Sequence, residues 1–340
     1  RRTAGGSTKR DAPGATERPW ASHTSWRAPK GEPWASALVV FAGPGGDLDL
    51  PARLRARGLS VTAVDTKQGG ARHDVLRAEV GDALLRRVRR GDFEMVFIAT
   101  PCASYSVAHR PQLRSRKQPA GLVNAPPEWR AYLSKHNALA RWSAALIDAA
   151  HAAGAAWALE NPADRGDISS PASWERFADH APIWLNEHIA ASLDAAGAAR
   201  RTFAQCSFGG LSQKYTTIAH AAELSVALAP LDGMACAHGN ERHEQRAHGR
   251  DAAGRSRAAM AAAYPPRMNE FLADAIAETL RRRRDTDVPQ HKSRGRSGGH
   301  VVDGAELFEL VAEACEEARR TAPRFASLRN KRAAGAAALA

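Results

Sequence analysis

The sequence predicts an α/β domain built on a mostly parallel, doubly wound sheet. Short apolar runs alternate with helix-like segments along the chain, and this alternation is typical of parallel sheets. Several of the apolar runs end in an unusual polar or glycine-containing motif, and such sheets bind their ligands at the carboxyl ends of the strands. We expect residues 36–281 to form this domain, with helices on both faces of the sheet.

Strands and helices are expected throughout this domain. Apolar runs that end at glycine, proline or charged residues predict buried strands, and longer alanine- and leucine-rich segments predict helices. The expected strands cover residues 37–42, 59–64, 95–99, 155–159, 202–207 and 215–220. The expected helices cover residues 50–57, 79–90, 136–153 and 268–281. The polar, basic stretch 103–130 is expected to be a long functional loop.

The remaining segments differ in composition from the domain. Residues 1–35 are rich in Gly, Ser, Pro and Arg, which predicts a disordered basic segment. A small recognition insert is expected at about 218–263. Residues 282–300 form a charged linker, and 301–340 contain an amphipathic helix followed by a tail.

Charge and cysteine content restrict the partners and the compartment. The chain of 340 residues has 48 Lys and Arg against 36 Asp and Glu, a net charge of +12. This excess favours an acidic partner, with nucleic acid before a membrane surface. Four scattered cysteines suit a reducing compartment. No apolar run approaches the length of a membrane span. We expect an intracellular monomer without a membrane partner, nuclear if its source is eukaryotic.

The first two strands end in features that suit a nucleoside-containing cofactor. Phe41 precedes the turn Gly43-Pro44-Gly45-Gly46, and glycines there let a ligand approach the backbone closely. Asp65 ends the next strand, where a carboxylate can accept hydrogen bonds from ribose hydroxyls. A helix-capping role for Asp65 is the alternative. The spacing lacks the full dinucleotide fingerprint, so a cofactor without a pyrophosphate is favoured.

Two further strand ends carry reactive side chains. Cys102 follows a buried strand and precedes the basic loop, and basic neighbours lower a thiol pKa and favour the nucleophilic thiolate. A small buried hydrophobe is the alternative for this residue. Glu160, in Glu160-Asn161-Pro162, ends a central strand, where burial favours a carboxyl group that holds a proton. A salt-bridged strand end is the alternative for Glu160.

The order of these motifs resembles the cytosine-C5 DNA methyltransferase family, and most closely its small phage- and transposon-like members. The resemblance spans about residues 37–280. In chain order it includes Phe41-x-Gly43-x-Gly45, Asp65, Asp74 before Val75-Leu76, Pro101-Cys102-Ala103-Ser104-Tyr105-Ser106, Glu160-Asn161-Pro162, Cys206-Ser207-Phe208-Gly209, Lys214-Tyr215-Thr216 and Tyr264-Pro265. No single motif is specific, and the ordered set carries the resemblance.

The resemblance implies a Rossmann-like fold that binds S-adenosylmethionine and methylates cytosine in DNA. It assigns Cys102 as the nucleophile and Glu160 as the group that holds a proton at the base. Cofactor binding is assigned to Phe41, Gly43, Gly45, Asp65 and Asp74. Phosphate contacts are assigned to Arg110, Arg114 and Lys214. Thr100, where the family usually has proline, and the reduced motif Gln213-Lys214-Tyr215 depart from the pattern.

Two other functions stay open. An RNA cytosine methyltransferase would use the same chemistry, and a small recognition insert suits a looped or single-stranded substrate. A catalytically inactive relic of a mobile element would bind nucleic acid through charge alone. Amino-methyltransferases are set aside, because they carry Asp/Asn-Pro-Pro-Tyr/Phe where this chain has Thr100-Pro101-Cys102-Ala103.

A histidine-rich patch raises the question of a metal. Cys and His are typical zinc ligands. The spacing of Cys236, His238, His243 and His248 matches no standard finger. We therefore predict no metal and interpret these residues as surface groups that face phosphate.

Overall fold

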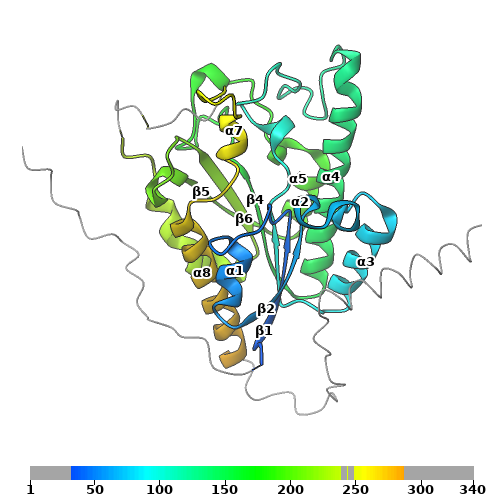
Figure 1. Cartoon of the computed structure of the whole chain (residues 1–340), viewed down its shortest axis with the longest axis vertical. Helices are drawn as coiled ribbons and strands as arrows, with labels where there is room; N and C mark the ends of the chain where they lie inside the picture. Colours follow the sequence, from blue (N-terminus) through cyan, green and yellow to red (C-terminus); the bar gives the residue numbers. More distant parts are fainter. Residues whose placement is uncertain (1–31, 239–242, 244–248, 287–340) are drawn as a thin grey trace, which may run out of the picture.

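The computed structural model describes residues 32–238, 243 and 249–286, and these form a mixed α/β fold compatible with a Rossmann-like architecture. The predicted α/β class is confirmed. A single six-stranded sheet has the order β2-β1-β3-β4-β6-β5 (Figure 1). The predicted segment 301–340 lies outside the described residues, as do residues 1–31 and 287–300 of the two other predicted segments.

The sheet is parallel except at one edge. Its strands are β1 (Ala35–Val40), β2 (Leu59–Val64), β3 (Met95–Ile98), β4 (Ala156–Pro162), β5 (Ala199–Ala204) and β6 (Tyr215–His220). The first four pair in parallel, whereas β6 runs antiparallel to both β4 and β5. The chain passes from β1 to β2 on one side and then crosses to β3 on the other. The carboxyl ends of β1 and β3 therefore form the topological switch point, where such sheets bind ligands.

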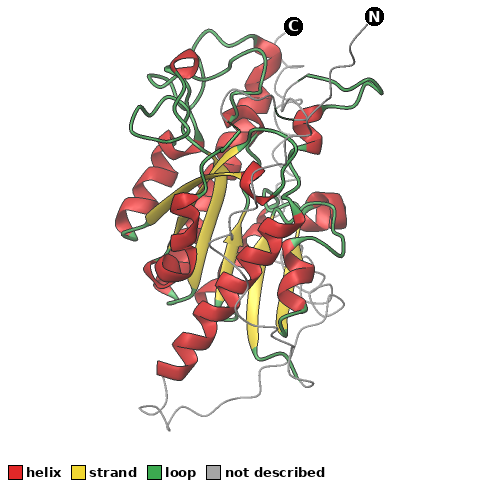
Figure 2. Ribbon diagram, turned by 90° about the vertical axis from the view of Figure 1, so that its left-hand side faces the viewer, coloured by secondary structure: helices red, strands yellow, loops and turns green. Residues whose placement is uncertain are grey.

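Helices cover both faces of the sheet. One face carries α3 (Ala78–Arg89), α4 (Pro127–Ala152) and α5 (Glu187–Ala195), and the other carries α1 (Leu50–Arg55), α6 (Ser225–Leu228) and α8 (Pro266–Thr286) (Figures 1 and 2). Two short helices, α2 (Thr66–Gly69) and α7 (Arg257–Met260), lie near the carboxyl ends of the strands. No helix among the described residues is long and apolar enough to cross a membrane.

Burial on both faces explains why the parallel strands are apolar throughout. In β1, Leu38 and Val40 contribute to the core under α3 and α4, whereas Ala37 and Val39 contribute to the core under α1 and α8. Side chains alternate across a strand, so a strand covered on both faces buries every side chain and is apolar throughout. Trp157 of β4 is among the largest fully buried side chains.

Several element boundaries differ from the prediction. Helix α4 begins at Pro127, not at residue 136, because proline at the first helical position starts a helix well and Trp129 and Tyr132 pack on a small cluster with Leu113. Helix α5 was not predicted, although the Asn186 side chain caps it by accepting from the Ile189 amide (3.3 Å).

Two strand and helix ends also lie further along the chain than predicted. Strand β4 continues through Pro162, because β6 offers pairing partners beyond the end of β3. Residues 282–286, predicted as linker, continue α8.

The predicted recognition insert at 218–263 is also corrected. Residues 218–220 belong to β6, and the helical turns η6 (Ala222–Leu224), α6 and η7 (Ala229–Gly233) pack against α8 and the sheet. Leu228 and Leu231 are fully or almost fully buried there. This stretch is core, so any part of the chain that projects from it begins after Met234.

Leu231→Ala tests whether this stretch is core. Truncating a buried leucine leaves a cavity and costs about 2–5 kcal/mol. We expect a loss of this size in the free energy of unfolding, measured by denaturant titration. Val226→Ala on the same stretch is the matched control, since Val226 is 65% exposed and a surface change stays within about 0.5 kcal/mol. Equal effects of the two variants would contradict the assignment.

Candidate active site

A large open cleft lies over the carboxyl ends of β1, β3 and β4. Its volume is about 2390 Å³. It brings together nine of the ten residues predicted for the site: Phe41, Gly43, Gly45, Asp65, Asp74, Cys102, Arg110, Glu160 and Lys214. Arg114 does not line it.

The turn after β1 is held in an unusual backbone conformation. Gly43 and Gly45 have φ of 82° and 87°, and Phe41 has φ of 61°. A left-handed conformation costs a residue with a side chain about 1–2 kcal/mol, so the surrounding structure must hold Phe41 in place. Its ring packs edge-on against Trp142 at 6.1 Å between centroids. A Cβ at Gly43 would meet nothing within 4 Å, so the backbone angle, not crowding, requires glycine there.

Asp65 fastens this turn to the end of β2. Its Oδ2 accepts from the Gly43 amide (2.8 Å), and its Oδ1 accepts from the Lys67 amide (2.7 Å) and so caps α2. The helix-capping alternative is therefore present in the structure. Each carboxylate oxygen keeps a second acceptor site. Asp74 lies further along the same cleft, where its Oδ1 accepts from the Leu76 amide (3.1 Å).

Cys102 begins the short helical turn η2 (Ala103–Tyr105) directly after β3 and is half-buried. Burial raises the pKa of its thiol, and the negative charge of Glu160 raises it further, whereas Lys214 opposes both effects. The predicted lowering of this pKa by the basic loop is therefore wrong. Desolvation outweighs the positive charge, so the free thiol is protonated at neutral pH.

Glu160 is buried in β4 with one oxygen paired and one left over. Its Oε2 accepts from the Tyr264 hydroxyl (2.7 Å), while Oε1 is buried without a hydrogen-bond partner. Burial, and then the charge and hydrogen bond of Glu160, raise the pKa of Tyr264 well above its usual range, so this hydroxyl stays a donor. An unpaired buried carboxyl oxygen is costly, and its presence in a cleft indicates a ligand group that completes the site.

The residues beside Glu160 and Cys102 are joined by buried hydrogen bonds. The Asn161 side-chain amide donates to the Thr100 carbonyl (2.7 Å), and the Thr100 and Ser143 hydroxyls are 2.7 Å apart. Thr100, the departure from the family pattern, thus ties β3 to α4. These contacts fix the two strand ends against each other.

The three predicted phosphate contacts lie in different surroundings. The Lys214 ammonium is 5.6 Å from the centre of the Tyr264 ring, close to the reactive groups. Arg110 is exposed at the cleft, where its guanidinium donates to the carbonyls of Val107 (2.9 Å) and His109 (2.7 Å).

Arg114 requires a correction, because it is buried (2% exposed). Its guanidinium donates to Ser104 Oγ (3.0 Å) and the Pro119 carbonyl (2.5 Å) and lies 3.9 Å from the centre of the Tyr105 ring. In place of a phosphate contact, the structure gives Arg114 a role in holding the loop after Cys102.

Sequence reasoning missed several residues of the cleft. Tyr264 was noted only as part of a Tyr-Pro pair, and no pattern pointed to its contact with Glu160 across a separation of 104 residues. His136 and Tyr132, on α4, line the cleft with ring centroids 4.5 Å apart. Arg165 also lines the cleft, beside Tyr215. Their placement depends on the path of α4 and of the segment after β4, which local sequence does not encode.

No protein-family model matches the chain, and no curated protein matches it either. The functional argument therefore depends on the geometry of the site.

Because of His136, we expect the folded protein to lose stability in acid. Its pKa falls from 6.5 to about 4, chiefly because burial disfavours the charged ring. Between these pH values the unfolded chain binds a proton that the folded chain does not, so stability falls as pH decreases from 6.5 to about 4. The gap corresponds to up to roughly 3 kcal/mol. His136→Asn, which keeps a donor near the Pro101 carbonyl, should flatten the unfolding free energy over this window in denaturant titrations. An unchanged slope would contradict the assignment.

Removing the charge of Lys214 and removing that of Glu160 should change the reactivity of Cys102 in opposite directions. Iodoacetamide modification, followed by mass spectrometry of the Cys102 peptide, should be slow at pH 7 and rise at alkaline pH. Lys214→Ala should shift this profile to higher pH and Glu160→Gln to lower pH, because the two charges act on the thiol pKa in opposite directions. Lys135→Ala is the matched control, a lysine that also lines the cleft. Shifts of the same sign in the Lys214 and Glu160 variants would refute this account.

Proposed function

We propose that this chain is an S-adenosylmethionine-dependent methyltransferase that acts on C5 of cytosine in nucleic acid, with Cys102 as the nucleophile. One observation carries the proposal. A half-buried thiol and a buried carboxyl group with an unpaired oxygen face the same cleft at the switch point of an α/β sheet.

The turn after β1 fits a cofactor of this kind. Its positive-φ glycines leave the backbone open to the cleft, and Asp65 and Asp74 keep acceptor sites for ribose hydroxyls or amino groups. Phe41, packed against Trp142, lines the same space. When bound there, S-adenosylmethionine would supply an electrophilic methyl group to the neighbouring base.

The groups around Glu160 fit a cytosine edge. A carboxyl group that holds a proton can donate it to the ring nitrogen N3, and Oε1 is the oxygen with no other partner. The Tyr264 hydroxyl fixes the opposite oxygen and so orients the carboxyl group. A base stacked in a duplex cannot reach this depth, so it would have to flip out, at a cost of a few kcal/mol.

The chemistry then follows from the two side chains. The Cys102 thiol first gives up its proton to solvent. The thiolate then adds to C6, so that its lone pair forms the S–C6 bond and the C5=C6 electron pair moves toward C4 and N3. Glu160 donates its proton to N3 and neutralises the developing charge. C5 thereby becomes an enamine carbon that can accept the methyl group. Loss of the C5 proton to water restores the C5=C6 bond and expels the Cys102 thiolate, and the proton on N3 returns to the Glu160 carboxylate.

The rim of the cleft suits a phosphate backbone. Arg110, Lys214, Arg165 and Arg176 line it, and the whole chain carries a charge of +12. DNA is the substrate that we propose. RNA is the second candidate, because residues 218–234 of the expected recognition insert belong to the core, and a small recognition element suits a looped or single-stranded substrate.

Methyl transfer from labelled S-adenosylmethionine to DNA and RNA tests the proposal. Wild type should yield 5-methylcytosine, Cys102→Ser should abolish it, and Glu160→Gln should lower the rate by about 10²–10³-fold. Val226→Ala is the control. Cytosine with fluorine at C5 should trap a covalent complex that requires Cys102, because fluorine cannot leave as a cation.

The polymer that is methylated separates DNA from RNA as the substrate. Cofactor binding without transfer to either polymer would refute the proposed substrate. Absence of both cofactor binding and transfer would leave a basic nucleic-acid-binding relic.

A further inference from the structure

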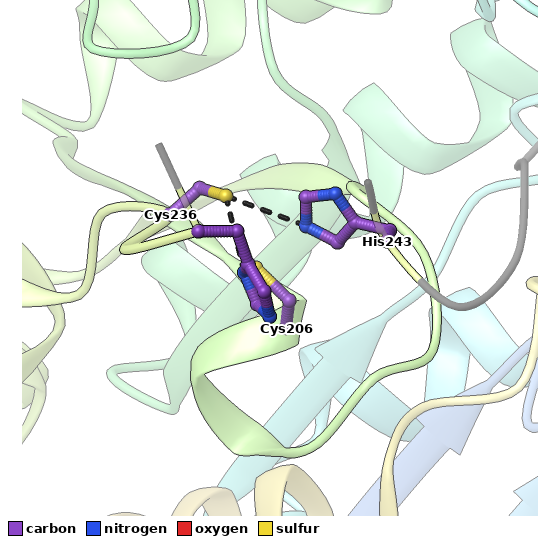
Figure 3. Close-up of side chains that lie close together, drawn as sticks. Cys206, Cys236 and His243 are labelled. Atoms are coloured by element: carbon purple, nitrogen blue, oxygen red, sulfur yellow. Dashed lines mark hydrogen bonds between the residues drawn. The ribbon is translucent and has the colours of Figure 1, made fainter. Parts of the chain in front are cut away.

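Four side chains that commonly bind metals meet beside the active-site cleft. Cys206 comes from the helical turn after β5, whereas Cys236, His238 and His243 come from the chain after η7. Their ligand atoms all lie within 4.8 Å of one another. Figure 3 shows Cys206, Cys236 and His243 converging on one point.

This group differs from the one that the sequence pattern suggested. Sequence spacing grouped Cys236 with nearby histidines and matched no standard finger, so no metal was predicted. Folding adds Cys206, which is 30 positions upstream of Cys236. His248 lies outside the described residues. Because Cys206 and Cys236 are far apart in the sequence, no local motif indicates the group.

The distances fit a tetrahedral ion. Cys236 Sγ is 3.5 Å from His238 Nδ1 and 3.3 Å from His243 Nε2. With zinc bonds of about 2.3 Å to sulfur and 2.0–2.1 Å to nitrogen, neighbouring ligand atoms of a tetrahedron lie roughly 3.5 Å apart. The two Cys236 distances match this spacing, and all four ligand atoms lie within 4.8 Å of one another.

We propose that Cys206, Cys236, His238 and His243 form a structural zinc site. Two thiolates and two imidazoles in tetrahedral arrangement are a donor set that zinc favours over the harder calcium and magnesium ions. Four protein ligands fill the coordination sphere and leave no position for a substrate or reactive water. The ion therefore holds structure together and takes no part in the chemistry.

The site joins two segments that border the cleft. The Gln205 amide, next to Cys206, donates to the Lys214 carbonyl (2.9 Å), and the Cys236 amide donates to the Tyr215 hydroxyl (3.1 Å). Zinc would fasten the chain after η7 to the β5–β6 turn that carries Lys214. This inference stands whether or not the chain is a methyltransferase, because its readout is metal content.

Metal analysis of the full chain tests the site. Protein purified with a phosphine reductant should contain about one zinc ion per chain. After removal of zinc with a chelator, added Co²⁺ should give the visible absorption of a tetrahedral ion and a near-ultraviolet thiolate-to-cobalt band. Zinc content no higher than in a Cys206→Ser/Cys236→Ser double variant would overturn the proposal. A Cys206–Cys236 disulfide in that reduced protein would do so as well.

Single substitutions separate coordination from packing. His243→Gln should weaken zinc binding by more than about 100-fold, since even second-shell partners of a metal ligand are worth 10–100-fold. His243→Cys should restore binding with a stronger thiolate-to-cobalt band, which a packing role does not predict. His188→Gln, at a histidine outside the cluster, should bind zinc like wild type. Circular dichroism of each variant against metal-free wild type identifies any variant that fails to fold. Equal zinc affinity of His243→Gln and wild type would contradict coordination.

Discussion

The hydrogen bond from the Asn161 side chain to the Thr100 carbonyl is the constraint on which the site depends. It joins the strand that delivers Cys102 to the strand that carries Glu160, at a point where the backbone pairing of β3 and β4 has already ended. Without it the direct pairing between these two strands would end at Ile98 and Leu159. Asn161 and Thr100 are both buried, so water does not compete for this hydrogen bond. The bond therefore holds the thiol and the carboxyl group in a fixed relation.

Burial of Cys102 and Glu160 works against formation of the thiolate, and a proton on Glu160 would offset part of this effect. The desolvation that suits a flipped base also raises the pKa of Cys102, and an ionised Glu160 raises it further. The proposed mechanism places a proton on Glu160, and the carboxylate charge that opposes the thiolate would then be absent. In the proposed mechanism the protonated state of Glu160 would therefore suit both the base and the nucleophile.

The sequence predicts the sheet and its strand ends well, because parallel strands buried on both faces show as continuous apolar runs. The same runs locate Gly43, Asp65, Cys102 and Glu160, since all four lie at or near strand ends. Contacts over long separations are not encoded locally. The bond of Tyr264 to Glu160 and the meeting of Cys206 with Cys236 depend on how α8 and the chain after η7 pack.

Composition also misleads where burial decides the outcome. A basic loop predicts an acidic thiol and exposed arginines, but Arg114 is inside that loop and Cys102 is governed by desolvation. The stretch after β6 was predicted to be a recognition insert, but its leucines complete the core under α8. Charge counts describe the surface of a chain and not which charges the fold places inside.

The β5–β6 turn links the two functional elements of the molecule. On one side it carries Lys214 beside Tyr264, and on the other it begins at Cys206 in the metal-binding cluster. The turn is held by side-chain hydrogen bonds such as that from Gln205 to the Thr216 hydroxyl (2.8 Å). Anchoring the turn at Cys206 restricts the backbone from which Lys214 extends. A zinc ion bound by the cluster would therefore act on the thiol indirectly, by limiting how far the compensating charge can move away from it.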